Sequence, residues 1–427
     1  MSTQVNVDRP WRVAVLAGMA SYLDAATLVT AGLAIGTLYA DAFDLSGGTV
    51  GALLGTQTLM FAVGALVGGR LGDALGRRRV FTVSLALLAA GATVLATATG
   101  TAMLWAGVVV TGFAIGADLP VSLALINEEA PEGKKGKMVA FSELLWGAGI
   151  LVANVLWVVL SSRGTIGARL VFAHLVVVAV VVLALRLSLR ESVEWAAARR
   201  AADRPAGQSG RVRFGEARQL LRAPLLATVA ATGLYYAAWG VGANTIGQFG
   251  SYLWVNLADG QSSTWAIVSA VGIPLAGIGG VLFLRVVDTP RRRRWLVAGT
   301  VLSLLAWLIP LVGVPIGIAL ICTSLLFVLG AAMSGETIYK VWSQELFPTL
   351  LRGTAQGVTL AVNRTAAGLF AFVVPVLAVS SPRLLFGIVL LLMVGGAVIA
   401  LVWVPRLPTA RELEEPPVVV GVEAAAT

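Results

Sequence analysis

The chain has 427 residues, of which 58% are hydrophobic and 12% are charged, about half the roughly 25% charge of a typical soluble domain. A soluble protein of this length could not shield so much apolar surface from water, so the composition indicates a polytopic helical membrane protein. One cysteine and one histidine also exclude a disulfide framework and a Cys/His metal cluster.

Twelve apolar runs follow one another along the chain, each close to or above the ~20 residues that cross a bilayer as a helix. The first ten residues are polar, so no cleavable signal peptide is expected. The runs predict spans near 12–38, 48–69, 80–99, 103–127, 138–160, 169–189, 224–247, 264–287, 295–312, 315–342, 354–379 and 382–404.

The positive residues orient these spans. If both termini are cytoplasmic, most of the 31 Lys and Arg residues fall on cytoplasmic segments. This asymmetry predicts a multi-pass protein of a bacterial-type inner (plasma) membrane with both termini inside. It also explains the net charge of +9 as a topology signal and a contact with anionic membrane lipids, with no nucleic acid as partner.

The longest polar segment separates the sixth and seventh spans and contains RRAADRPAGQSGRVR. The sequence therefore predicts an N-terminal six-helix bundle at 1–189, a cytoplasmic linker at 190–222 and a C-terminal six-helix bundle at 223–405. The end of the chain, 406–427, is polar and then small and apolar, which is typical of a disordered cytoplasmic tail.

Two short patterns occur twice. EEAPEGKKG begins at Glu128, and ELFPTLLRG begins at Glu345, 217 positions later. GGRLGDALGRRR places Asp73 four residues before Arg77, and LRVVDTPRRRR repeats that spacing 215 positions later. Nearly equal offsets of two unrelated patterns predict a duplicated six-span unit. Two such units can rock about a central site and expose it to each side in turn, which indicates a transporter.

At these residues the chain resembles the major facilitator superfamily. GGRLGDALGRRR is similar to the loop-two signature of that family, and ELFPTLLRG, EEAPEGKKG and RESVEW are similar to signatures of its sugar-porter branch. The resemblance covers essentially residues 10–405. It implies an all-α membrane protein with twelve transmembrane helices in two pseudo-symmetric six-helix bundles. By motif position it also implies an inner gate made of Asp73, Arg77, Glu129, Arg190, Glu191, Asp288, Arg292, Glu345 and Arg352.

The chain departs from the sugar-porter pattern at several places. Lys135 replaces the usual arginine of the loop-four motif, and the loop-eight motif lacks its glycine and carries Pro290. A lysine cannot form the bidentate pair that an arginine forms. The Gly-Pro signature of drug–proton exporters is absent from SELLWGAGILVAN, which makes export less favoured than import.

Three acids in the N-terminal half are predicted to take part in proton coupling, because ionisable residues inside spans are costly and usually functional. Asp24, in the first span, is similar in position to the proton-carrying acid of proton-coupled sugar porters; the alternative is that it only bonds helix ends. Asp118 is a candidate second acid, because the family's span-four arginine is absent here. Glu143 stands where sugar porters often carry a glutamine, and it can bind a hydroxyl, carry the proton or be structural.

The seventh span contains GANTIGQFGSYLW, which resembles the sugar-porter segment whose amides bind hydroxyl groups. Asn244 and Gln248 are four residues apart and share a helix face. Tyr236 and Trp239 can stack on the apolar face of a sugar ring, or they are lipid-facing or packing residues. Trp146 in the fifth span is a further substrate-binding candidate.

The tenth and eleventh spans also carry ionisable residues. Glu336 is a proton-coupling candidate that can instead pair with Lys340 one turn later. Asn363 and Arg364 are substrate-binding candidates, and a guanidinium with a free fork is suited to clamp a carboxylate. Alternatively, Glu336 or Asp24 neutralises Arg364 in the empty protein.

The sequence interpretation is therefore a monomeric secondary active transporter that imports a small hydroxylated solute, such as a sugar, polyol or sugar acid, together with protons. The chain contains no G-x-x-x-x-G-K-[ST], so no nucleotide cofactor is expected. The alternatives are an organic-anion or aromatic-acid transporter that uses Arg364 as its clamp, and a proton-driven exporter. A membrane enzyme or a sensor would need a catalytic constellation or an output domain, and neither is evident.

Overall fold

The computed structural model describes residues 10–131, 135–192, 196, 218–287, 289–347, 352–409 and 412. The described part of the chain is almost wholly helical. Its main helices are α1 (Pro10–Leu33), α2 (Tyr39–Ala42), α3 (Gly47–Leu75), α4 (Arg77–Ala96), α5 (Thr101–Glu129), α6 (Lys135–Leu160), α7 (Thr165–Arg186), α10 (Leu225–Ala258), α11 (Ser262–Leu284), α12 (Arg292–Leu308), α13 (Ile316–Ser334), α14 (Glu336–Glu345), α15 (Arg352–Ala371), α16 (Val374–Ser380) and α17 (Pro382–Val398).

Eleven helical spans among the described residues are long and apolar enough to cross a membrane. A twelfth span is formed if the bent pair Thr354–Ala371 and Val374–Ser380, which meet at 40°, is counted as one. Helices satisfy their backbone hydrogen bonds internally, which is why a chain this apolar folds into them in a bilayer. With the bent pair counted as one span, the predicted number of twelve is confirmed.

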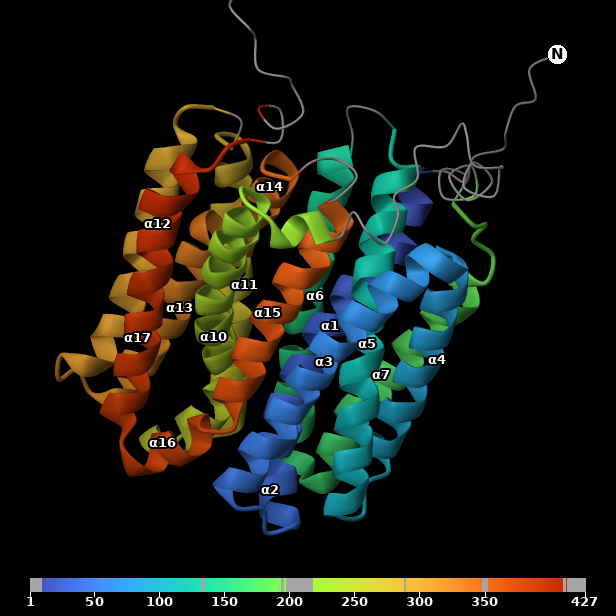
Figure 1. The fold of residues 1–427 in the computed structure, drawn as a ribbon. Helices are drawn as coiled ribbons and strands as arrows, with labels where there is room; N and C mark the ends of the chain where they lie inside the picture. The colour runs from blue at the N-terminus through green and yellow to red at the C-terminus, as the bar shows by residue number, and fades with distance from the viewer. Residues whose placement is uncertain are drawn as a thin grey trace, which may run out of the picture.

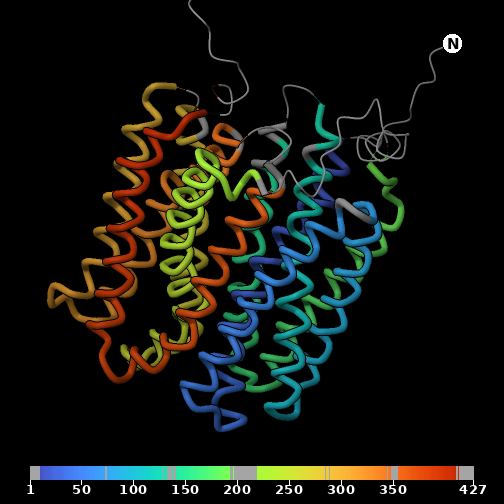
Figure 2. Tube along the Cα trace, in the orientation of Figure 1, coloured from blue at the N-terminus to red at the C-terminus, as the bar shows by residue number. Residues whose placement is uncertain are grey.

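The helices form two bundles that lie side by side (Figure 1). The first contains α1 to α7, and the second contains α10 to α17. The same separation of the blue-to-green half from the yellow-to-red half is visible in the chain trace (Figure 2). Most of the predicted linker at 190–222 and most of the predicted tail at 406–427 lie outside the described residues.

The two ends of the bundles differ in charge. We call the end where α1 begins the basic end, because Arg77 and Arg292 open α4 and α12 there; α2 and α16 lie at the opposite end (Figure 1). Gly76 joins α3 to α4 with φ 101 and ψ 152, a conformation that L side chains rarely adopt. This requirement gives a physical reason for the glycine that precedes the basic run in GGRLGDALGRRR.

The bundles meet along a seam between α1, α3 and α6 of the first and α10, α11 and α15 of the second. Gly32 lies so close to α10 that an added Cβ would be 2.0 Å from the backbone oxygen of Gln248. Gly51, near the start of α3, packs in the same way against the backbone oxygen of Ala371. Both contacts lie in the half of the molecule away from the basic end, so the bundles are closely packed there.

The structure differs from the predicted spans at two helices that border the seam. α10 runs to Ala258, eleven residues beyond the predicted end of the seventh span at 247. The tenth span is broken at Gly335 into α13 and α14, with φ −84 and ψ −128 at the break. The apolar residues after 247 hide the longer end of α10 from a hydropathy search, and hydropathy carries no signal for the change of backbone direction at Gly335. The break places Glu336 at the first position of a helix inside the membrane span.

Candidate functional site

A buried ion pair crosses the seam near its middle. Nη2 of Arg364 on α15 lies 3.3 Å from Oδ2 of Asp24 on α1, and the two side chains are 14% and 2% exposed. The guanidinium carbon of Arg364 stands 4.2 Å from the ring centroid of Phe61 on α3. Asp24 therefore faces Arg364, which is one of the two alternatives that the sequence left open. Phe61 was not predicted, because a phenylalanine in an apolar span gives no signal.

A second set of charges lies beside this pair. Nζ of Lys340 is 3.0 Å from Oε1 of Glu336 on the same helix and also contacts Oε1 of Glu143 on α6. The pairing of Glu336 with Lys340 follows from their i, i+4 spacing. The contact with Glu143 joins the two bundles, and no sequence spacing predicts it.

Trp146, one turn after Glu143 on α6, faces the carboxylate of Asp24. It is partly buried and packs against the hydrophobic core of the seam. Trp146, a predicted substrate-binding residue of the N-terminal bundle, therefore lies next to the Asp24–Arg364 pair.

Aromatic rings form a stack on the C-terminal side of the charges. The rings of Tyr236 and Tyr339 are 3.9 Å apart between centroids with 9° between their planes, and the Tyr236 and Trp239 rings are 5.8 Å apart at 13°. Tyr236 is 2% exposed, so it does not face lipid. Trp239 lies against the helix break, where a Cβ added to Gly335 would be 2.4 Å from the indole nitrogen.

The predicted amides lie in a hydrogen-bond chain across the seam. Nδ2 of Asn244 donates to Oε1 of Gln248 at 2.9 Å, and Oγ1 of Thr58 on α3 donates to the same oxygen at 3.3 Å. Nε2 of Gln248 donates to Oε1 of Gln57 at 3.3 Å, and Gln57 in turn donates to Thr111 at 3.1 Å. Gln57 and Thr58 were missed, although GTQTLM is a polar interruption of the second span that could have indicated them.

Asn363 is buried within the C-terminal bundle and donates to the backbone carbonyl of Tyr236. This bond joins α15 to α10 and leaves the Asn363 amide directed at the protein backbone. A direct contact of Asn363 with substrate stays a prediction.

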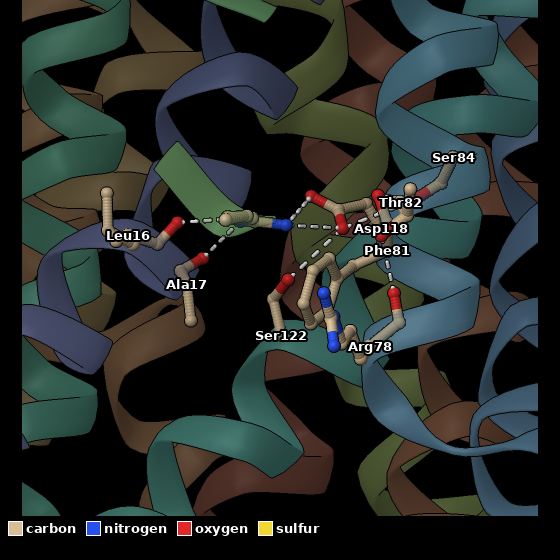
Figure 3. Close-up of polar contacts among 9 residues, drawn as sticks. Leu16, Ala17, Arg78, Phe81, Thr82, Ser84, Asp118 and Ser122 are labelled. Atoms are coloured by element: carbon tan, nitrogen blue, oxygen red, sulfur yellow. Dashed lines mark hydrogen bonds and ion pairs between the residues drawn. The ribbon is translucent and has the colours of Figure 1, made fainter. Parts of the chain in front are cut away.

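Asp118 lies apart from the seam, inside the N-terminal bundle. Its carboxylate is 2.8 Å from Nη1 of Arg186 and accepts hydrogen bonds from the hydroxyls of Ser84 and Ser122 (Figure 3). Arg186, 1% exposed on its side chain, also donates to the carbonyls of Leu16 and Ala17 at 2.7 and 2.9 Å. The carboxylate is thus bound by partners from α4, α5 and α7 within one bundle, and the role of a second titrating acid stays a prediction for Asp118.

The gate motifs form equivalent ion pairs in the two bundles. Nη2 of Arg77 lies 2.8 Å from Oε1 of Glu128, and Nη1 of Arg292 lies 2.6 Å from Oε1 of Glu345. The basic members are 215 positions apart and the acidic members 217, so the duplication inferred from the sequence recurs in side-chain geometry. The partner of Arg77 in this pair is Glu128, one residue before the predicted Glu129.

The remaining gate residues have different positions. Oε1 of Glu191 accepts hydrogen bonds from the backbone nitrogens of Arg77 and Arg78, which caps the start of α4. Arg190 is exposed at the basic end. The side chains of Asp73, Asp288 and Arg352 lie outside the described residues.

The fold and this site define a class: a membrane transporter of two repeated six-helix bundles with ionised groups buried at the seam between them. The family model described as Major Facilitator Superfamily matches residues 14–371. The chain belongs to the major facilitator superfamily.

The chain is similar along most of its length to several known transporters. It is 29% identical over 374 residues to the minor myo-inositol transporter IolF of Bacillus subtilis, covering 85% of this chain and 83% of that one. It is 25% identical to the glucose transporter GlcP of Staphylococcus epidermidis, covering 78% and 80%. The inward-open structure of the xylose transporter XylE from Escherichia coli superimposes with a TM-score of 0.72 at 18% identity, covering 95% and 99%.

Proposed function

We propose that this protein imports a small, neutral, hydroxylated solute, a sugar or a polyol, together with protons. The observation that carries the proposal is the buried Asp24–Arg364 pair, which joins the two bundles at the seam. Charges taken out of water inside a membrane protein are retained where ions or substrates pass. A pair that joins two moving bundles changes its environment in every transport cycle, so ionisable groups at this level of the seam are suited to couple protons to that movement.

The amides and aromatic rings beside the pair suit a hydroxylated solute. Asn244 and Gln248 bond Gln57 and Thr58 here, and these neutral hydrogen bonds can be exchanged for bonds to solute hydroxyls at little net cost. Trp239 offers an indole whose nitrogen is buried and lacks a hydrogen-bond partner among the described residues. The relatives that transport myo-inositol and glucose support a solute of this kind.

The orientation follows from the charge asymmetry. We place the basic end in the cytoplasm, because cytoplasmic segments of membrane proteins are enriched in Lys and Arg. Glycine contacts pack the seam toward the opposite end, so this conformation is closed on the outer side.

The test is uptake by the purified full-length protein in proteoliposomes, with an inward proton gradient of one pH unit. One coupled proton should drive about tenfold accumulation. The panel is myo-inositol, D-glucose, D-xylose and nicotinate, and a protonophore is the control. We expect accumulation of at least one neutral solute that the protonophore abolishes. If the neutral solutes only equilibrate across the membrane, both with and without the protonophore, proton coupling is rejected.

One observation favours a second candidate, an organic anion. Nε of Arg364 is buried and makes no hydrogen bond to the described residues, so the guanidinium retains a free donor beside its bond to Asp24. A carboxylate can occupy such a fork. Accumulation of nicotinate, with none of the three neutral solutes accumulated, would favour this candidate over a sugar or polyol.

Alternating access predicts a specific effect at Gly32. Gly32→Ala should shift the conformational equilibrium away from the outer-closed state, because its methyl group would lie 2.0 Å from the backbone oxygen of Gln248. Overpacking of this kind costs about 1–3 kcal/mol, which corresponds to a shift of roughly 5- to 150-fold. The measurement is the solute counterflow rate, alongside the melting temperature. Gly277→Ala is the control, since no atom lies within 4 Å of its added Cβ. Equal counterflow rates in the two variants would contradict the prediction.

A further inference from the structure

Lys340 lies between carboxylates that belong to different bundles. Glu336, on the same helix, is 3.0 Å from its Nζ, and Glu143 on α6 contacts Nζ from the N-terminal bundle. The side chains of Lys340, Glu336 and Glu143 are 18%, 19% and 30% exposed, whereas that of Asp24 is 2% exposed. Protons from water therefore have readier access to these three groups than to Asp24.

The charges at this part of the seam do not balance. Asp24 on α1, Glu143 on α6 and Glu336 on α14 are the acids, while Lys340 on α14 and Arg364 on α15 are the bases. Within the described part of the chain, the other titratable groups that face Glu336 are the tyrosines Tyr236 and Tyr339, which are neutral in their protonated form. Three carboxylates against two cations leave one negative charge in excess. One bound proton makes the set neutral, and a neutral set is favoured inside a membrane.

The geometry indicates where the excess lies. Asp24 and Arg364 face one another, so their charges are compensated within that pair. Among the described residues, Lys340 is the cation within ion-pair distance of both Glu143 and Glu336, and one ammonium group cannot neutralise two carboxylates. The excess negative charge is therefore shared by Glu143 and Glu336.

The contact between Lys340 and Glu143 is placed so that it can hold the bundles together toward the basic end. Glu143 is eight residues into α6, or about 12 Å from the basic end at 1.5 Å per residue. Asp24 is 14 residues into α1, or about 21 Å from that end. The lysine contact thus lies on the basic side of the Asp24–Arg364 pair.

We infer that Lys340 is the coupling switch, and that the transported proton is carried by Glu336 while Lys340 pairs with Glu143. This inference rests on the proposed proton-coupled transport. When Lys340 turns to Glu143, it links the bundles on the basic side, and Glu336 loses its counter-ion and takes up a proton from the outer side. When the link opens, Lys340 returns to Glu336 and displaces the proton toward the basic side. The proton moves on and off a carboxylate oxygen, and no other bond changes.

The transport test compares Glu336→Gln with Asp41→Asn in proteoliposomes, using whichever of myo-inositol, D-glucose or D-xylose the wild type accumulates. Asp41 is an exposed acid of α2 at the opposite end. Glu336→Gln should lose the entire accumulation, about tenfold for one pH unit, and should keep solute counterflow. Asp41→Asn should retain both. Proton-driven accumulation by Glu336→Gln equal to that of the wild type would overturn the inference.

A second measurement needs no solute. Spin labels at Leu75 and Arg285, two exposed positions near the basic end, report the separation of the bundles in a background with Cys322→Ser. The wild type should move from short to long distances as pH rises. Glu336→Gln should give mainly short distances with no dependence on pH, because Lys340 then has only Glu143, and Glu143→Gln should give mainly long distances. Equal, pH-independent distances in all three proteins would overturn the switch.

The two tests separate the inference from the proposed function. If the wild type accumulates none of the neutral solutes with a proton gradient, the proposed function fails at that step. If the wild type is coupled and Glu336→Gln is coupled as well, the proposed function stands and only the inference is rejected.

Discussion

Arg186→Met should destabilise the N-terminal bundle by about 3–5 kcal/mol, because it leaves the carboxylate of Asp118 buried without its counter-ion. The substitution also removes the donors that bind the carbonyls of Leu16 and Ala17, so α1 loses its polar attachment to α7 at this level. The measurement is the melting temperature of the purified protein in detergent.

The matched control keeps the ion pair and removes one neutral donor. Ser122→Ala deletes a hydroxyl 3.2 Å from Oδ1 of Asp118 and should cost about 1 kcal/mol. If Arg186→Met fails to fold, the double variant Asp118→Leu with Arg186→Met provides the test, since replacing both members of a buried pair by apolar residues is often neutral. A melting temperature of Arg186→Met equal to that of Ser122→Ala would contradict the role of this pair.

The same double variant tests where the proton is carried. Asp118 and Arg186 lie inside one bundle and away from the seam, so proton-driven accumulation should persist in the folded double variant. Loss of accumulation with normal counterflow would instead support Asp118 as the second titrating acid.

Asp24→Asn should abolish both proton-driven accumulation and solute counterflow. The substitution removes the carboxylate that faces Arg364, and an uncompensated buried charge costs about 3–5 kcal/mol. This outcome differs from that of Glu336→Gln, which should keep counterflow. The resemblance implies that Asp24 is the proton carrier. In that case Asp24→Asn should lose proton-driven accumulation and keep counterflow, which is the result expected here for Glu336→Gln.

A double-mutant cycle isolates the pair. Arg364→Gln alone should also be destabilising, and the combined Asp24→Asn, Arg364→Gln variant should be more stable than the sum of the single effects predicts. Residues in direct contact typically show interaction energies of about 0.5–3 kcal/mol. The measurement is the melting temperature of the four proteins in one detergent, and strictly additive effects would show that the two side chains do not interact.

Much of the architecture could be predicted from the chain. The number of spans follows from the apolar runs, because a bilayer accepts only segments that satisfy their own backbone. The repeated motifs gave the duplication, and the pairs Arg77–Glu128 and Arg292–Glu345 recur at those motifs. The pairing of Glu336 with Lys340 could also be predicted, because the i, i+4 spacing depends on a single helix.

The sequence by itself determined which residues lie at membrane depth, but only the tertiary structure decided which of them meet. Asp24 and Asp118 give the same signal, a single acid in an apolar run, yet one faces Arg364 across the seam and the other faces Arg186 within a bundle. Hydropathy reports how deep a residue lies and not the direction in which its side chain points around the helix. The partners are 340 and 68 positions away, so they are fixed by how the helices pack and rotate against one another.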